Sequence, residues 1–188
     1  NKDLFDKFGV PYPKDGMTWE DARELAVKLT RNEGGVQYYG LFPDNVYRGA
    51  YQASLPFVDL KNNKAVFQTE EWKNLFQLWY SLYKMPGAEI MPKEMNTVNG
   101  FKTGQIAMFS GYSGQIPDLL TMKDMKWDIV TYPTNKTAPG VGQRVDSPMM
   151  SVTNASKAKD AAMQVISVLL SDEVQTEMTK NLQSSVLK

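Results

Sequence analysis

The sequence of 188 residues contains no cysteine and no histidine. Without cysteine the chain has no disulfide, no thiol nucleophile and no iron–sulfur cluster. Without histidine it lacks the imidazole base of a Ser-His-Asp triad and a principal zinc ligand. These two absences exclude most familiar hydrolase mechanisms.

An excess of charge and long apolar runs are also missing. The 21 Lys and Arg residues balance 21 Asp and Glu residues, so the chain has no sequence-wide positive field for phosphate backbones, and we expect no nucleic-acid partner. The longest apolar stretch, residues 163–170, falls well short of the ~20 residues that span a bilayer. At about 150 residues per domain, the length predicts one large domain, or one domain with part of another.

What the sequence does contain is an alternation of helical and strand patterns. Thr18 and Asp21 form a capping-box pattern, and Thr69 and Ser171 precede two further amphipathic segments. Helices are predicted after residues 18, 69 and 171, around 94–101, and over 116–122 and 156–170. Strands are predicted over residues 38–42, 105–109, 127–132 and 149–153, with a hairpin over 60–67. This alternation predicts an α/β fold.

Paired carboxylates are the main candidates for catalysis. Each pair, at residues 20–21, 70–71 and 172–173, opens a predicted helix, where negative charge stabilises the exposed N–H groups. A carbohydrate-active enzyme would instead need Asp44 or Asp146 to face a second acid at about 5–10 Å. That enzyme remains one alternative, and a protein-interaction module that docks through its last helices is another.

Aromatic side chains divide into two groups. Trp19, Trp72 and Trp79 lie on the apolar faces of predicted helices and are expected in the core. Tyr47 and Tyr51, together with Tyr112, lie in segments that we expect to be polar loops. Tyrosine rings beside amides, hydroxyls and charged groups are the mixture that a carbohydrate pocket needs.

Several motifs in order resemble a known family. The chain opens with Asn-Lys-Asp-Leu-Phe and continues with Pro-Tyr-Pro at 11–13 and Thr-Trp-Glu-Asp at 18–21. A Phe-x-x-Gly-x-x-Ala-Met element follows at 101–108, then Tyr-Pro at 132–133 and Ser-Lys-Ala-Lys-Asp-Ala-Ala at 156–162. This series is similar to the extracellular solute-binding proteins of sugar-importing ABC transporters, the group that contains maltose-binding protein.

The resemblance implies a periplasmic-binding-protein-like α/β lobe with further chain crossing to a second lobe. On that basis residues 1–132 are expected to form a C-terminal-type ligand-binding lobe. Residues 133–142 would be a linker or hinge region, and residues 143–188 would cross back to the other lobe. The last helices would then place an apolar face, with Val165 and Leu169, against that lobe.

The resemblance also implies the ligand-binding residues. They fall on two loops and on a segment near the hinge: Asp44, Asn45, Tyr47, Arg48, Tyr51, Gly111, Tyr112, Ser113, Gln115, Arg144 and Asp146. The family's stacking tryptophan corresponds to Gly114 in this sequence, and Tyr112 stands where the family has glycine.

The function that the resemblance implies is non-catalytic capture of a saccharide or similar polar solute. The solute would be delivered to the membrane permease of an ABC importer, with no metal and no cofactor. A monomer is expected, located extracellularly or in the periplasm, with a lipid anchor on the outer face of the membrane as one arrangement.

Overall fold

The computed structural model covers residues 1–188 and describes all of them except 88–90, 92–97, 146–148, 182–184 and 186–188. The chain divides into two compact units. Unit 1 consists of residues 1–111 and 122–144, and unit 2 of residues 112–121 and 145–188. The domain boundaries expected from the sequence stay a prediction.

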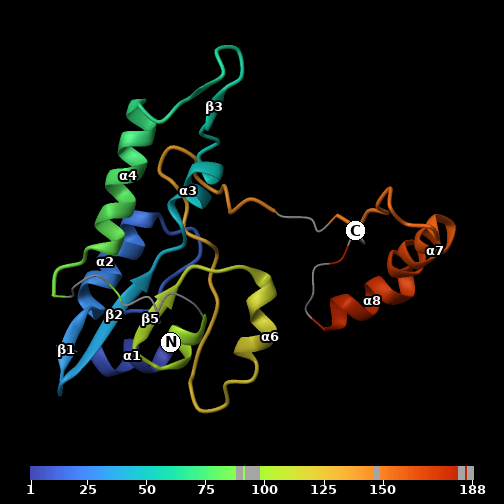
Figure 1. The fold of residues 1–188 in the computed structure, drawn as a ribbon. Coiled ribbons are helices and arrows are strands. Elements are labelled where there is room, and N and C mark those ends of the chain that lie inside the picture. Colours follow the sequence, from blue (N-terminus) through green and yellow to red (C-terminus); the bar gives the residue numbers. More distant parts are fainter. Residues whose placement is uncertain (88–90, 92–97, 146–148, 182–184, 186–188) are drawn as a thin grey trace. The chain divides into compact units, whose positions relative to one another are not determined.

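Unit 1 alternates helices and short strands (Figure 1). In chain order they are α1 (Lys2–Phe8), α2 (Trp19–Leu29), β1 (Arg31–Glu33), β2 (Val36–Phe42), α3 (Val46–Gln52), β3 (Val58–Asp59), β4 (Lys64–Ala65), α4 (Glu70–Tyr83), α5 (Val98–Lys102) and β5 (Ile106–Phe109). The strands β3 and β4 form a hairpin that begins at Val58, two residues before the predicted span of 60–67, and Asn63 takes the left-handed backbone, with φ of 49°.

The main sheet has the strand order β1-β2-β5, and β2 lies at its centre. The β1 strand pairs antiparallel with β2, whereas β5 pairs parallel with it, so that Tyr39 lies opposite Ile106 and Phe42 opposite Phe109. Because the two parallel strands end side by side, the residues that follow Phe42 and Phe109 meet at one edge of the sheet. Ligands of open α/β sheets commonly bind at such an edge.

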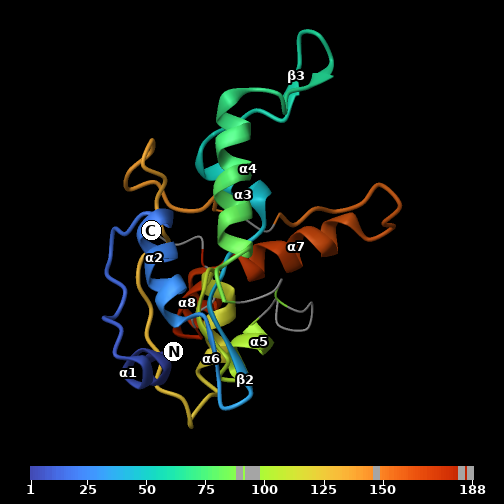
Figure 2. The same cartoon turned by 90° about the vertical axis from the view of Figure 1, so that its left-hand side faces the viewer.

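Two apolar clusters hold the helices to this sheet. The larger cluster unites Trp19, Trp72 and Trp79 with residues of α2, α3 and β2, and the smaller joins α1 and α2 to β5. The core role predicted for the three tryptophans is therefore confirmed. Figure 2 shows α3 beside α4, against which it packs.

The starts of α2 and α4 agree with the sequence-based predictions. The Thr18 hydroxyl accepts a hydrogen bond from the Asp21 amide while the Asp21 carboxylate accepts one from the Thr18 amide, which completes the capping box of α2. The Thr69 hydroxyl caps α4 in the same way by accepting from the Trp72 amide. On α4 the buried face consists of Trp72, Leu75, Trp79 and Leu82, whereas Phe76 is exposed at the surface.

Two predicted strands are absent from the described structure. Residues 127–132 alternate in polarity, yet they do not pair with another strand of the described structure. Thr131 instead forms hydrogen bonds with the turn at residues 15–16: its amide donates to Asp15 Oδ1, and its hydroxyl accepts from the Gly16 amide. Residues 149–153 have no strand partner either, and Met149 is almost fully exposed. An extended segment needs a neighbouring strand to become part of a sheet.

Unit 2 contains the short helices η2 (Ser113–Gln115) and α6 (Ile116–Leu119), followed by α7 (Lys159–Leu169) and α8 (Asp172–Lys180). The Ser171 hydroxyl caps α8 by accepting from the Val174 amide, as predicted. The α7 helix has no buried residue, and Val165 and Val168 on it are more than half exposed. In the part of the chain that the structure describes, no helix is long and apolar enough to cross a membrane.

Candidate functional site

The candidate site begins at the shared end of β2 and β5. The Asp44 amide, two residues beyond β2, donates to the hydroxyl of Ser110, the first residue after β5, over 2.6 Å. The Asp44 carbonyl accepts from the indole of Trp79 on α4, also over 2.6 Å. The backbone of Asp44 is therefore held by two side chains, that of Ser110 after β5 and that of Trp79 on α4.

The segment after Asp44 is a helix, and the prediction of a loop here was wrong. Asn45 is the N-cap of α3, and Gly49 of this helix lies directly against the Trp79 indole, where a Cβ atom would collide with the ring. Because Gly49 and Ala50 are buried, the helix is held by packing that local sequence does not reveal.

Tyr47 and Tyr51 lie one turn apart on α3 and are 43% and 38% exposed. Their rings meet edge to face with centroids 6.2 Å apart. Two large apolar rings on one helix, each with substantial surface open to solvent, provide a platform for a ligand that has apolar C–H faces.

Three polar side chains form a closed ring next to this platform. Arg48 Nε lies 3.1 Å from Asp44 Oδ2, and Arg48 Nη1 donates to Gln143 Oε1 over 3.0 Å. Gln143 Nε2 closes the ring by donating to Asp44 Oδ2 over 2.9 Å. The side chains of Arg48 and Asp44 are only 19% and 12% exposed, so this ion pair is partly screened from water.

A buried glutamine holds the segment that carries Gln143. Gln52 is 2% exposed, and its Nε2 donates to the carbonyls of Pro133 and Val141, each over 2.7 Å. Its Oε1 accepts from the Trp19 indole and from Asn135 Nδ2. Residues 133–141 are therefore attached to α3 along much of their length.

Arg144 follows Gln143 and lies over a tyrosine of the platform. Its guanidinium carbon is 4.1 Å from the centroid of the Tyr51 ring, a cation–π contact. The corresponding distance from Arg48 to the Tyr47 ring is 5.7 Å. The candidate site thus combines two tyrosine rings with two guanidinium groups, and that of Arg48 lies beside the Asp44 carboxylate.

The hydroxyl of Tyr132 is also part of this region, and it is buried without a hydrogen-bond partner among the described residues. Burial raises the pKa of Tyr132 to about 12, and the Asp44 charge acts in the same direction. The neighbouring side chains of Gln143 and Ser110, and the Arg48 charge, oppose this increase. Tyr132 is therefore neutral at physiological pH.

The structure brings together six of the predicted site residues in unit 1: Asp44, Asn45, Tyr47, Arg48, Tyr51 and Arg144. Gly111 ends the first stretch of unit 1, one residue after Ser110. Tyr112, Ser113 and Gln115 belong to unit 2, where the Tyr112 amide donates to Gln115 Oε1 over 3.1 Å. Asp146 lies outside the described residues. The role of each in binding stays a prediction.

Sequence reasoning did not predict the anchoring role of Gln52 and did not include Gln143 in the site. Gln52 and Gln143 are ordinary amides without a motif around them, and their partners lie 81 to 99 residues away in several cases. No signal within a single sequence could have joined Gln143 to Asp44.

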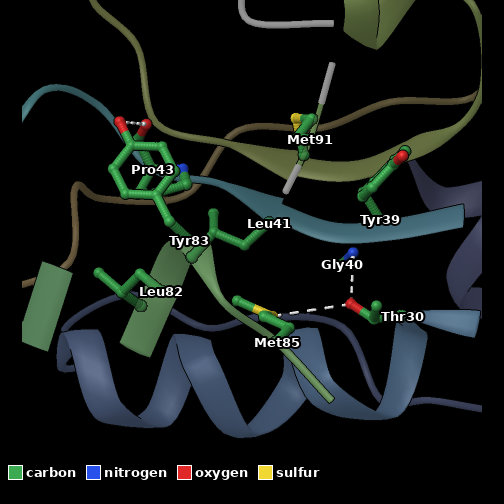
Figure 3. A pocket seen from close by; sticks show the side chains of 9 residues that line it. All are labelled: Thr30, Tyr39, Gly40, Leu41, Pro43, Leu82, Tyr83, Met85 and Met91. Carbon is green, nitrogen blue, oxygen red and sulfur yellow. Dashed lines mark hydrogen bonds between the residues drawn. The ribbon is translucent and has the colours of Figure 1, made fainter. Parts of the chain in front are cut away.

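A separate pocket in unit 1 is too small for a solute. Figure 3 shows it between β2 and the end of α4, where mainly apolar side chains such as Leu41, Leu82 and Met85 line it. Its volume is about 10 Å³, the scale of one water molecule. Among the described residues, no group of three Asp or Glu side chains is placed to hold a metal ion.

The fold and this strand-end site define a periplasmic-binding-protein-like lobe, and comparison with known proteins agrees. The profile of the family described as "Bacterial extracellular solute-binding protein" matches residues 1–186, so the chain belongs to that family. No curated protein is similar enough by sequence to count as a relative.

Several solved structures share the fold. An ABC substrate-binding protein from Listeria monocytogenes, in complex with cycloalternan, matches with a TM-score of 0.75 at 23% identity, over 100% of this chain and 49% of the other. A sugar transporter from Rhizobium etli matches with 0.63 at 27% identity, over 95% and 47%. A solute-binding protein from Agrobacterium vitis with bound D-mannitol matches with 0.66 at 22% identity, over 95% and 46%. The chain therefore spans about half the length of these proteins.

Proposed function

We propose that unit 1 supplies one side of a saccharide or polyol site in a solute-binding protein of an ABC importer. The observation that carries this proposal is the pair of exposed rings, Tyr47 and Tyr51, beside the ring of polar side chains at the ends of β2 and β5. Family membership supports the transport role, and the relatives with bound cycloalternan and D-mannitol support this ligand class.

The chemistry of the site suits a neutral, hydroxyl-rich solute. Sugars stack C–H faces on aromatic rings and exchange hydrogen bonds with amides, carboxylates and guanidinium groups. Tyr47 offers a half-exposed ring, while Arg144 lies over Tyr51 and brings N–H donors to the same platform. The remaining predicted residues, Gly111, Tyr112, Ser113, Gln115 and Asp146, are proposed to complete the site.

The bonding of Asp44 argues for binding without turnover. Its Oδ2 accepts from Gln143 and lies beside Arg48, while its Oδ1 accepts from the Asn45 amide over 2.7 Å. Both oxygens of Asp44 are therefore engaged within the protein, whereas glycoside hydrolysis needs carboxyl groups that face the glycosidic bond. We propose capture outside the cytoplasm by a monomer and delivery to a membrane permease, with solute contacts favouring a closed state.

The proposal is tested by calorimetric titration of the purified protein with cycloalternan, D-mannitol and linear gluco-oligosaccharides. For any sugar of this panel that the wild-type protein binds, Tyr47→Ala should weaken the binding free energy by about 1–3 kcal/mol, as expected for a binding-site aromatic. Tyr80→Ala removes an equally large and more exposed ring from α4 and is the matched control. Equal losses in both variants, release of product from any sugar, or no binding in the whole panel would contradict the proposal.

A further inference from the structure

The ring of Asp44, Arg48 and Gln143 joins two segments that are nearly a hundred residues apart. Asp44 Oδ2 accepts, Arg48 donates, and Gln143 does both, because a primary amide presents a donor and an acceptor side by side. The third position in this ring therefore needs a side chain that both donates and accepts a hydrogen bond. Neither a second carboxylate nor a second guanidinium could fill it without placing like charges together.

Gln143 immediately precedes the residue that lies on the tyrosine platform. Arg48 and Tyr51 are neighbours on one helix, so anchoring Gln143 to Arg48 also sets the place from which the Arg144 side chain reaches the Tyr51 ring at 4.1 Å. We infer that Gln143 is a positioning residue of the candidate site, which holds Arg144 over Tyr51 through its bonds to Asp44 and Arg48. Its importance for solute binding rests on the proposed function.

This role is separable from general support of the loop. The buried anchor of residues 133–141 is Gln52, which binds the carbonyls of Pro133 and Val141 directly. Loss of the bonds made by Gln143 should therefore leave residues 133–141 attached and release the residues that follow them, including Arg144. A purely structural contribution of Gln143 would instead lower stability without moving Arg144.

The experiment exchanges the charges within the ring. Asp44→Asn removes the carboxylate that lies beside Arg48, and Gln143→Glu sets a second carboxylate against Asp44 Oδ2, so each single variant should displace Arg144. The double variant again has one carboxylate, one amide and Arg48, with complementary donors and acceptors. The readout is the ring-current shift of the Arg144 side-chain resonances, with Tyr51→Leu as the reference that lacks the ring.

Both single variants should lose most of this shift, and the double variant should recover it. Binding of cycloalternan or D-mannitol, measured by calorimetry, should weaken about tenfold or more in Gln143→Glu, since a lost charge-assisted hydrogen bond has that scale. The inference would be overturned if the Arg144 resonances of Gln143→Glu kept the ring-current shift of the wild type. It would also be overturned if the double variant lost this shift as the single variants do. If neither probe binds the wild-type protein, the proposed function fails, while the shifts still decide the role of Gln143.

Discussion

Replacement of Gln52 by methionine tests how the candidate site is built. The change keeps the length of a side chain that is 2% exposed but removes four hydrogen bonds, to Trp19, Asn135, Pro133 and Val141. A net contribution of about 1 kcal/mol for each bond gives about 4 kcal/mol, and the larger apolar surface of methionine offsets a part of it. We expect a loss of about 3 kcal/mol, a large fraction of the stability of a typical domain.

Urea unfolding at equilibrium measures this loss as a lower midpoint at an unchanged slope. Gln68→Met, the same substitution at an exposed position before α4, is the matched control and should stay within about 0.5 kcal/mol. Amide exchange should become faster in residues 133–141 of the Gln52 variant, because their two anchored carbonyls lose their donor. A loss below 1 kcal/mol, or exchange that rises equally throughout unit 1, would refute this account of the loop.

Three further substitutions test other parts of the arrangement. Gly49→Ala should cost about 1–3 kcal/mol in urea unfolding, because the new methyl group collides with the Trp79 ring, and a stabilised variant would show that α3 can shift. Tyr132 deprotonates more readily when unfolded, since its folded pKa is raised to about 12 from 10. Its contribution to stability is therefore complete below pH 10 and falls by up to about 3 kcal/mol as the pH rises through 12. The free energy of unfolding of Tyr132→Phe should fall less than that of the wild type over this pH range, as measured by urea unfolding at several pH values. Parallel pH dependences in the two proteins would contradict the burial of the hydroxyl. Tyr112→Ala should weaken sugar binding by about 1–3 kcal/mol at nearly unchanged stability, and unaffected calorimetric titration would remove Tyr112 from the site.

Much of unit 1 could be predicted because its strongest elements carry local signals. As N-cap residues, Thr18 and Thr69 predict the starts of α2 and α4, and the apolar run at residues 38–42 predicts the central strand β2. The α3 helix could not be predicted in this way. It is only seven residues long, and its buried face depends on the fit of Gly49 against Trp79, which is 30 positions away.

The same reasoning explains the errors elsewhere in the chain. Residues 127–132 have the polarity of a strand, but Thr131 finds its partners in the turn at Asp15 and Gly16 rather than in another strand. Periodicity predicts which side chains are buried in a sheet and carries no information on whether a neighbouring strand exists. Tyr47 and Tyr51 were predicted as pocket aromatics on a loop. They lie instead on a helix and are partly exposed, and their role in binding stays a prediction.

The bonding within the site separates positions that can vary from positions that cannot. A change at Asp44, Arg48 or Gln143 takes one partner away from each of the other two, which are polar and partly buried, so each of these residues is constrained by the other two. Tyr47 and Tyr51 instead present exposed rings, and substitution there removes contact area without stranding a polar atom. Substitutions at the two tyrosines should therefore change which solute is preferred, while the ring of polar side chains keeps the arrangement of the site unchanged.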